Sequence, residues 1–592
     1  MIETKIAGGS FVLDDIDSEL VVTPEDFNEE QRMILQTTVD FLEGEVLPKD
    51  EEIEKLDYEL TLDLLKKAGE LGLLSADVPE EYDGLGLDKV SSTIISETLA
   101  RAASFGLSVG AHVGIGTLPI IFFGTPEQKK KYLPQLATGE KIAAYCLTEP
   151  ASGSDALGAK TTAKLSEDGQ HYILNGSKIF ITNAGFADIF IVYAKVDGKD
   201  FSAFIVEKEM PGFSLGPEEK KMGIKGSSTR PLYFEDCKVP VENLLGEVGR
   251  GHIIAFNILN IGRFKLGAGC LGGAKEAIEH SVKYANTRKQ FGTEISSFPL
   301  IGKKLADMNI RTFVAESMVY RTSGLIDHIL KDLDHSSPDA GKQSAKGIAE
   351  YALECSINKV FASEVLDFLA DEAVQIHGGY GFTQEYKVER IYRDSRINRI
   401  FEGTNEINRM LIPGTLLKKA MKGELPLLQK VQSLQSELMS MTPGSQSFEG
   451  TLEQESHLLA QAKKLFLMVG GMAVQKLQAN IEKEQEMLSN LADLMIEIYA
   501  MESVLLRTKK LIARQGEDKV KNAIQMTEVY LHEAFAKIEA IAKQCLVMVE
   551  EGDMLRTGLS MVKRLTRTSP INTISLKREI AQRVIQAEKY VV

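Results

Sequence analysis

The chain has 592 residues, 44% of them apolar, so it can bury large cores and should divide into about three or four domains. Its 84 acidic residues outnumber 68 basic ones, and the formal net charge of −16 argues against general nucleic-acid binding. The five cysteines are odd in number and never spaced as Cys-x-x-Cys, which is typical of a reducing compartment without a disulfide framework or a zinc site.

The first twenty residues, "MIETKIAGGSFVLDDIDSEL", carry acids where a secretion signal needs a basic region followed by an apolar run. No uninterrupted apolar segment approaches the ~18 residues of a membrane span. The sequence therefore predicts a cytoplasmic protein without a membrane anchor.

The predicted elements follow one another as helices, sheet and helices. Residues 28–143 have apolar side chains at three- and four-residue spacing, and this N-terminal region should be a helical domain. Residues 144–250 form short alternating or β-branched runs separated by turns, and they should make an all-β domain. Long helices return over 251–420. A further helix and a polar stretch occupy 421–456, which is predicted to be a linker region, and 457–592 should form an extra helical domain.

Three motifs stand out along the chain. The segment "GAGCLG" (267–272) matches Gly-x-Gly-x-x-Gly but lies within a helical run, which favours close helix packing over dinucleotide binding. The segment "YCLTEPASGSD" (145–155) runs from a strand end into a turn whose hydroxyls and amides suit phosphate oxygens and a polar cofactor edge. The alternative for this second segment is an ordinary polar turn at a domain junction.

The third motif, "RIFEGTNEINR" (399–409), places Glu402 beside apolar neighbours and before a chain reversal. Poor solvation there would raise the pKa of the carboxyl group and make it a base near neutral pH. The alternative is a helix-entry acid, with Thr404 or Asn405 capping the helix that follows.

Four segments, "YCLTEPASGSD", "KIFITNA", "TRKQFG" and "QIHGGYGF" with "IFEGTNE", resemble the flavin-dependent acyl-CoA dehydrogenases over about residues 28–420. The resemblance implies a helical bundle, a β-barrel middle domain and a second, four-helix bundle. The extra C-terminal block, together with "GAHVGIG" (110–116) and "NIGRF" (260–264), is most similar to the very-long-chain branch and to bacterial long-chain enzymes.

The resemblance implies that Glu402 removes the α-proton of an acyl-CoA thioester while the β-hydrogen leaves as hydride to FAD. The backbone N–H of Glu402 and a flavin hydroxyl would polarise the thioester carbonyl. Some relatives carry the base immediately before the arginine of "NIGRF"; here that position is Gly262, which cannot serve.

The resemblance also implies the remaining contacts. For FAD they are Tyr145, Cys146, Leu147, Thr148, Ser152, Gly153, Ser154, Phe180, Ile181, Thr182, Arg288, Phe291, Gln375, Gly378, Gly379, Thr404, Asn405 and Glu406. For acyl-CoA they are Ser154, Asn260, Arg263, Phe401, Glu402 and Gly403. Arg288, Gln375, Gly378 and Gly379 would hold the FAD of a neighbouring subunit. Many relatives have Trp where this chain has Phe180, and no metal is expected.

The resemblance further implies that electrons pass to an electron-transferring flavoprotein, with an acyl-CoA oxidase or a catalytically idle helical assembly protein as alternatives. A homodimer is expected, because the C-terminal block would occupy the surface that smaller relatives use to form tetramers. Leu107 and Ala111 are apolar where a medium-chain relative has bulky polar side chains, which predicts a preference for roughly C14 to C18 saturated acyl chains.

Overall fold

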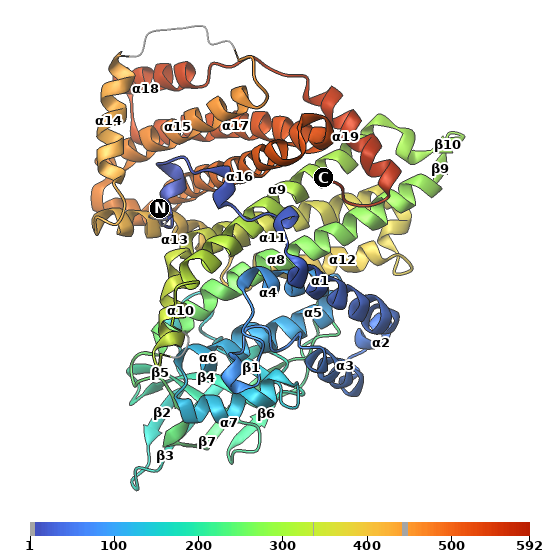
Figure 1. The fold of residues 1–592 in the computed structure, drawn as a ribbon. Helices are drawn as coiled ribbons and strands as arrows, with labels where there is room; N and C mark the ends of the chain where they lie inside the picture. Colours follow the sequence, from blue (N-terminus) through green and yellow to red (C-terminus); the bar gives the residue numbers. More distant parts are fainter. Residues whose placement is uncertain (1–5, 335–336, 441–447) are drawn as a thin grey trace.

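The computed structural model describes residues 6–334, 337–440 and 448–592, and its N-terminal region is helical as predicted (Figure 1). Its helices are α1 (Glu29–Phe41), α2 (Asp50–Ile53), α3 (Tyr58–Glu70), α4 (Lys89–Leu99), α5 (Ala103–Gly110), α6 (Leu118–Phe123) and α7 (Pro126–Ala137). A π-helical segment, η7 (Ala111–Thr117), joins α5 to α6. The buried His112 fastens this segment, because its Nδ1 accepts from the amide of Ala143 at 3.0 Å and its Nε2 lies 2.9 Å from the carbonyl of Leu136.

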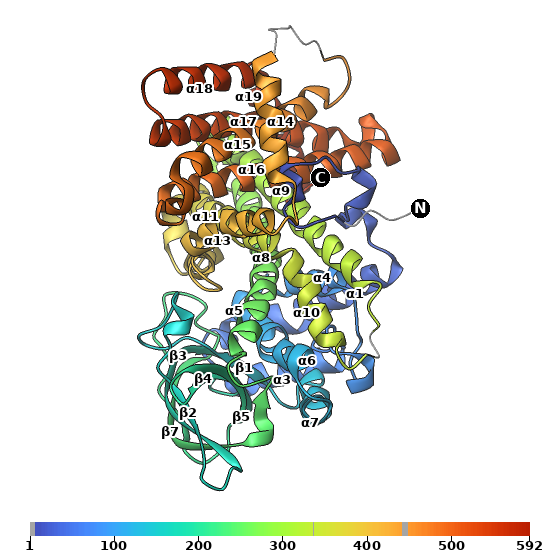
Figure 2. The ribbon, with the colours of Figure 1, turned by 90° about the vertical axis from the view of Figure 1, so that its left-hand side faces the viewer.

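The middle domain is a sheet of eight strands in the order β6-β7-β3-β2-β4-β5-β8, with β1 parallel to β4. The strands are β1 (Ala143–Cys146), β2 (Thr162–Leu165), β3 (His171–Thr182), β4 (Ile189–Val196), β5 (Asp200–Glu207), β6 (Phe213–Leu215), β7 (Thr229–Pro240) and β8 (Leu244–Leu245). Figure 2 shows the sheet curling around its own core. No β6–β8 pairing closes it within residues 143–245, all of which are described, so closure into a barrel stays a prediction.

The second helical domain is built on two long helices, α8 (Gly251–Thr287) and α9 (Pro299–Leu330), and on α11 (Ala352–His377), which packs along both. Helices α10 (Ala340–Glu350), α12 (Lys387–Ser395) and α13 (Asn405–Met421) complete it, and a two-stranded hairpin, β9 (Lys289–Gln290) with β10 (Thr293–Glu294), follows α8. The motif "GAGCLG" lies inside α8. A Cβ on Gly272 would stand 2.1 Å from the carbonyl oxygen of Glu97, so close helix packing is confirmed there.

The C-terminal block is helical, as predicted, and packs on α9, α11 and α13 (Figure 1). Its helices are α15 (Glu453–Leu477), α16 (Gln485–Gln515), α17 (Lys521–Val549), α18 (Gly552–Leu565) and α19 (Thr573–Ala587). The further helix expected within 421–456 is α14 (Leu427–Ser440), which buries Leu434 and Leu438 and packs against α15. The part at 441–447 lies outside the described residues.

Buried ion pairs join this block to the rest of the chain. Glu502 on α16 accepts from Arg321 on α9 and from Lys463 on α15, each at 2.6 Å. The segment before α1 also docks here, since Glu25 pairs with Arg507 at 2.6 Å and Asp26 with Lys510 at 2.7 Å. Charges buried in this way stabilise an interface only when each has a partner, as these have.

The sequence was expected to hold no apolar segment long enough to span a membrane, and one helical stretch corrects this expectation. The continuous helical stretch Ala103–Phe123 has 21 residues and a mean hydropathy of 1.6, and its length and composition alone would let it cross a membrane. Its most apolar window is 72% buried inside the protein. The stretch is therefore built as a core element of the N-terminal domain.

Candidate active site

Glu402 lies in a sharp turn between α12 and α13. Its φ is 57° and that of Gly403 is 80°, so two successive residues adopt the left-handed conformation. Glycine accepts this conformation freely, whereas a residue with a Cβ is strained by about 1–2 kcal/mol. Thr404 then caps α13, because its Oγ1 accepts from the amide of Ile407 at 3.2 Å. Thr404 is therefore the cap of α13, and Glu402, two residues before it, is a separate carboxylate that does not serve as the cap.

Cationic and amide side chains hold this turn by its backbone carbonyls. Arg263 Nε donates to the carbonyl of Glu402 at 3.2 Å. Lys359 Nζ donates to the carbonyl of Gly403 at 2.8 Å, and Asn408 Nδ2 donates to the same oxygen at 2.9 Å. The strained turn is thus fixed from α8, α11 and α13 together.

The carboxyl group of Glu402 is buried against Gly262. A Cβ built on Gly262 would stand 2.4 Å from Glu402 Oε2, so only glycine leaves room for the carboxylate. This oxygen has no hydrogen-bond partner among the described residues. Burial raises the pKa of Glu402 to about 7, although the charges of Arg263 and Lys359 oppose the rise. Glu402 therefore has the proton affinity of a base that works near neutral pH.

A largely apolar cavity of about 210 Å³ opens beside Glu402. One face of α8 lines it with Gly262, Leu266, Gly269 and Gly273, spaced three or four residues apart. From the opposite side, α4, α5 and η7 contribute Leu99, Ala100, Ala103, Gly106, Leu107, Gly110, Ala111 and Gly114. Leu107 and Ala111 therefore both line this cavity, and whether they form its floor stays a prediction.

One of the strand residues predicted to contact FAD lines this cavity. Thr182, at the end of β3, lines it together with Phe401 and Glu402. Phe180 occupies a bulge between β3 and β7, has a φ of 60° and leaves its side chain 61% exposed. Bulges commonly re-aim a side chain beside an active site. Its neighbour Ile181 is buried in the sheet core.

The turn after β1 has two kinds of predicted contact residue. Cys146 and Leu147 are buried, and Lys178 anchors the turn by donating to the carbonyl of Leu147 at 3.2 Å. Ser152 is also buried, and its hydroxyl donates to the carbonyl of Asp155 at 2.6 Å. Gly153 and Ser154 are exposed, whereas Tyr145 and Thr148 are half-buried.

A second predicted set gathers at the far end of α8. Arg288, Phe291, Gln375, Gly378 and Gly379 are all exposed, and the guanidinium of Arg288 lies 5.4 Å from the ring centre of Tyr380. The 37 residues of α8 extend about 55 Å. Thr182 of the first set lines the cavity together with Gly262, in the first third of α8, whereas Arg288 of the second set follows the last residue of the helix, about 38 Å further along it.

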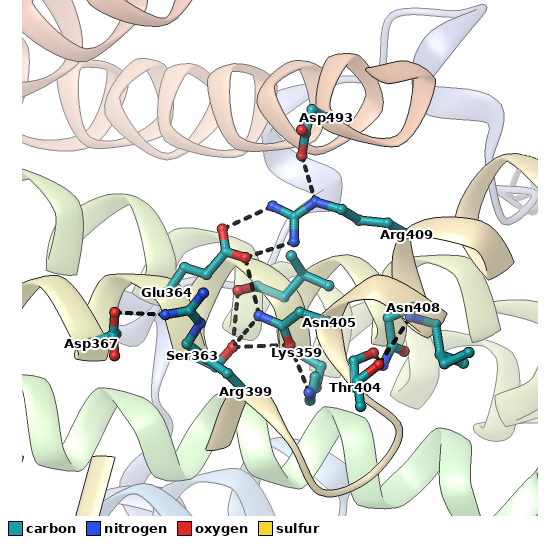
Figure 3. Close-up of polar contacts among 12 residues, drawn as sticks. Lys359, Ser363, Glu364, Asp367, Arg399, Thr404, Asn405, Asn408, Arg409 and Asp493 are labelled. Carbon is teal, nitrogen blue, oxygen red and sulfur yellow. Dashed lines mark hydrogen bonds and ion pairs between the residues drawn. The ribbon is translucent and has the colours of Figure 1, made fainter. Parts of the chain in front are cut away.

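The remaining predicted residues surround the turn. Asn260 and Arg263 are buried on α8 and hydrogen-bonded to each other at 3.2 Å. Glu406 is exposed, whereas the side chain of Asn405 is buried and satisfied by protein groups (Figure 3). A contact of Asn405 with a cofactor would therefore use its backbone.

Four family models cover most of the chain. Acyl-CoA dehydrogenase N-terminal, middle and C-terminal domain models match residues 28–140, 144–237 and 249–417, and a further C-terminal domain model matches 461–564. A "Probable acyl-CoA dehydrogenase" of Bacillus subtilis (strain 168) is 60% identical over 99% of this chain and 98% of its own length. The chain belongs to the acyl-CoA dehydrogenase family.

Two further relatives extend this assignment. The mitochondrial "Very long-chain specific acyl-CoA dehydrogenase" of Bos taurus is 36% identical over 93% of this chain and 85% of its own length. A crystal structure of an acyl-CoA dehydrogenase complexed with FAD from Bacillus anthracis is 60% identical, covers 99% of this chain and 100% of that one, and has a TM-score of 0.98. The C-terminal block therefore belongs to the shared architecture of these long family members.

The members of this acyl-CoA dehydrogenase family are FAD-dependent, and the residues present fit that cofactor. Phe180, two residues before the cavity-lining Thr182, offers an exposed aromatic ring, which suits a flat ring system. A Cβ on Gly378 or Gly379 would meet no atom within 4 Å, so a ligand can approach the backbone there. Arg288 supplies an exposed cation for a phosphate group.

Two features of this dehydrogenase site escaped the sequence reasoning. Gly262 was recognised as unable to act as a base, but its role of making room for Glu402 was missed. Lys359 was missed altogether, although it is fully buried and reaches the catalytic turn. A single lysine between apolar residues of the run "INKVF" was the available signal, since a buried lysine needs a specific partner.

Proposed function

We propose that this chain is an FAD-dependent dehydrogenase that converts long-chain saturated acyl-CoA into trans-2-enoyl-CoA. One observation carries the proposal: the carboxyl group of Glu402, whose Oε2 is shielded from solvent, lines a largely apolar cavity and has a pKa raised to about 7. A carboxylate in that state can accept a proton from a carbon held beside it, and this proton abstraction is the first step of the reaction.

In this mechanism Glu402 accepts the α-proton of the thioester through Oε2, which has no other hydrogen-bond partner among the described residues. Negative charge then develops on the thioester oxygen, and the amide N–H of Glu402 would stabilise it. Arg263 and Lys359 keep that amide in place through the carbonyls of the turn. When bound, FAD would accept the hydrogen and the electron pair that leave the β-carbon.

The cavity wall supports a long acyl chain as the substrate. From Gly262 to Gly273 the lining part of α8 runs about 16 Å, and it contributes three glycines together with Lys265 and Leu266. Each buried methylene contributes about 0.8 kcal/mol, so a long apolar wall favours long chains. The preference for roughly C14 to C18 follows from this transfer energy.

We also infer that two subunits share each FAD and that the enzyme is a homodimer. The two predicted cofactor-contact sets are separated by about 38 Å along α8, so one chain would need a second copy to surround the cofactor. An electron-transferring flavoprotein would then reoxidise the flavin. Light scattering tests the dimer, and hydrogen peroxide yield during turnover tests the alternative of an oxidase.

Anaerobic bleaching of the flavin by a series of saturated acyl-CoAs tests the proposed reaction. We expect fast bleaching by palmitoyl-CoA and slow bleaching by butyryl-CoA. An enzyme that binds FAD but is bleached by no acyl-CoA of any length would contradict the assignment.

A further inference from the structure

A chain of short polar contacts connects the C-terminal block to the catalytic turn (Figure 3). It begins at Asp493 on α16, whose Oδ1 accepts from Arg409 Nε at 2.8 Å. The other two nitrogens of this guanidinium, on α13, donate to both carboxylate oxygens of Glu364 on α11, at 2.6 and 2.9 Å. A two-pronged pair of this kind fixes direction as well as distance.

The chain continues from Glu364 to the turn. Asn405 Nδ2 donates to Glu364 Oε1 at 3.1 Å, and Asn405 Oδ1 accepts from Lys359 Nζ at 2.6 Å. The same ammonium donates to the carbonyl of Gly403 at 2.8 Å. Since one end of the Asn405 amide donates and the other accepts, its orientation is set by both neighbours.

These contacts matter because the turn is strained. Glu402 has a φ of 57°, which a residue with a Cβ adopts only where surrounding contacts enforce it. Lys359 is fully buried, so it cannot exchange its protein partners for water without moving the turn. A contact that fixes Lys359 therefore also fixes the carbonyl that follows the catalytic base.

We propose that Asp493 is a remote positioning residue of this enzyme. Through Arg409, Glu364 and Asn405 it holds Lys359, and through Lys359 it holds the turn that presents Glu402 to the substrate. The C-terminal block then helps to position the carboxylate of Glu402 in addition to its structural role. This inference rests on the proposed dehydrogenase function.

The charges around Glu402 agree with this role. The groups that act on its carboxylate are the cations Arg263 on α8 and Lys359 on α11, and both oppose the rise that burial causes in its pKa. Tyr145 on β1 also interacts electrostatically with this carboxylate. Burial lowers the pKa of Lys359 itself to about 8, so this ammonium is charged at neutral pH. Removing the charge of Lys359 should therefore raise the pKa of Glu402 further.

The test compares Asp493→Asn with a matched control, Asp307→Asn. Asp307 on α9 pairs with Lys577 of α19 at 2.7 Å, so it also joins the C-terminal block to the second helical domain, but the contacts described above do not link it to the turn. We expect Asp493→Asn to slow anaerobic flavin reduction at saturating palmitoyl-CoA by about 3- to 30-fold, with KM and FAD content unchanged. Asp307→Asn should react like wild type.

Hydrogen–deuterium exchange supplies a readout that needs no turnover. Amides of residues 400–405 should exchange faster in Asp493→Asn than in Asp307→Asn, and Asp493→Glu should restore both exchange and rate. Lys359→Met should raise the pH midpoint of kcat/KM, whereas Lys359→Arg should leave it near the wild-type value.

Equal rates and equal exchange in Asp493→Asn and Asp307→Asn would overturn the proposal. A Lys359→Met variant whose kcat/KM keeps the wild-type pH midpoint would also overturn it. This second measurement does not require any substitution at Asp493. If wild-type enzyme is bleached by no acyl-CoA, the proposed function fails, while the exchange comparison still decides whether Asp493 positions the turn.

Discussion

Two buried glutamates in this molecule have opposite surroundings. Glu316, in the interface between α9 and the C-terminal block, accepts from Lys275 at 2.5 Å, pairs with Arg507 at 2.7 Å and accepts from Tyr590 at 2.8 Å. Burial would raise the pKa of Glu316, but Lys275 and Arg507 hold it well below the ordinary range. Glu402 is half-buried as a residue, but its Oε2 is shielded from solvent and has no hydrogen-bond partner among the described residues. Burial raises its pKa to about 7.

The difference shows how one side-chain type takes two roles. Where each oxygen has a cationic or hydroxyl partner, a buried carboxylate stabilises the interface between two domains. Where one oxygen is left without a partner beside an apolar cavity, the carboxylate keeps its capacity to bind a proton. The following substitutions separate these two roles.

The largest effect is expected on the rate. Glu402→Gln keeps the shape of the side chain but removes its basicity, so anaerobic flavin reduction by palmitoyl-CoA should fall by about 10²- to 10⁴-fold. FAD content, measured from the visible spectrum, should not change. A variant that is reduced at the wild-type rate would remove Glu402 from the mechanism.

The same comparison predicts stability changes of opposite sign at pH 8. The pKa of Glu402 is about 7 in the folded state against an ordinary value of 4.5, so the folded protein loses stability as the pH rises from 4.5 to 7. At pH 8, Glu402→Gln should therefore increase the free energy of unfolding by up to about 3 kcal/mol. Glu316 has a lowered pKa, which stabilises the fold above pH 4.5 and is lost on acidification. Glu316→Gln should therefore destabilise the protein, by about 3–5 kcal/mol. Denaturant unfolding at pH 8 measures both, and equal signs would refute the comparison.

A smaller loss of rate is expected from Gly262→Ala. The added Cβ would lie 2.4 Å from Glu402 Oε2, so the carboxylate must move. A displacement of about 1 Å can cost about 10²-fold in rate. We expect slower flavin reduction with KM nearly unchanged, measured by stopped-flow absorbance. A wild-type rate would show that the position of the carboxylate is not critical.

The smallest effect concerns chain length. Gly110 lies in the cavity wall, and a Cβ there would meet no atom within 4 Å, so Gly110→Leu can fill the pocket without a clash. The optimum should move to shorter acyl chains as space for a few methylenes is lost, each worth about 0.8 kcal/mol. Gly44→Leu is the matched control, since Gly44 also meets no neighbour and does not line the cavity. An unchanged kcat/KM profile in Gly110→Leu would place the acyl chain elsewhere.

Periodicity predicted the order of helices, sheet and helices, because the spacing of apolar residues is local. The role of Glu402 and the pocket position of Ala111 were implied by the family resemblance, whereas the residues alone left Glu402 open between a base and a helix-entry acid. The contacts from Asp493 to Gly403 could not be predicted in this way, since they join residues 41 to 84 positions apart in the sequence. The left-handed conformation of Phe180 also has no local signal, because it arises from the bulge between β3 and β7. The docking of Glu25 and Asp26 on α16 likewise depends on the tertiary fold.

The pH dependence of kcat/KM for anaerobic flavin reduction by palmitoyl-CoA tests the central claim most directly, because this parameter reports the ionisation of the free enzyme. The base must be ionised to act, so the account predicts that kcat/KM rises with pH with a midpoint near 7, the raised pKa of Glu402. A profile that is already flat from pH 5.5 upward would mean that Glu402 ionises like an ordinary solvated carboxylate, and it would contradict the account.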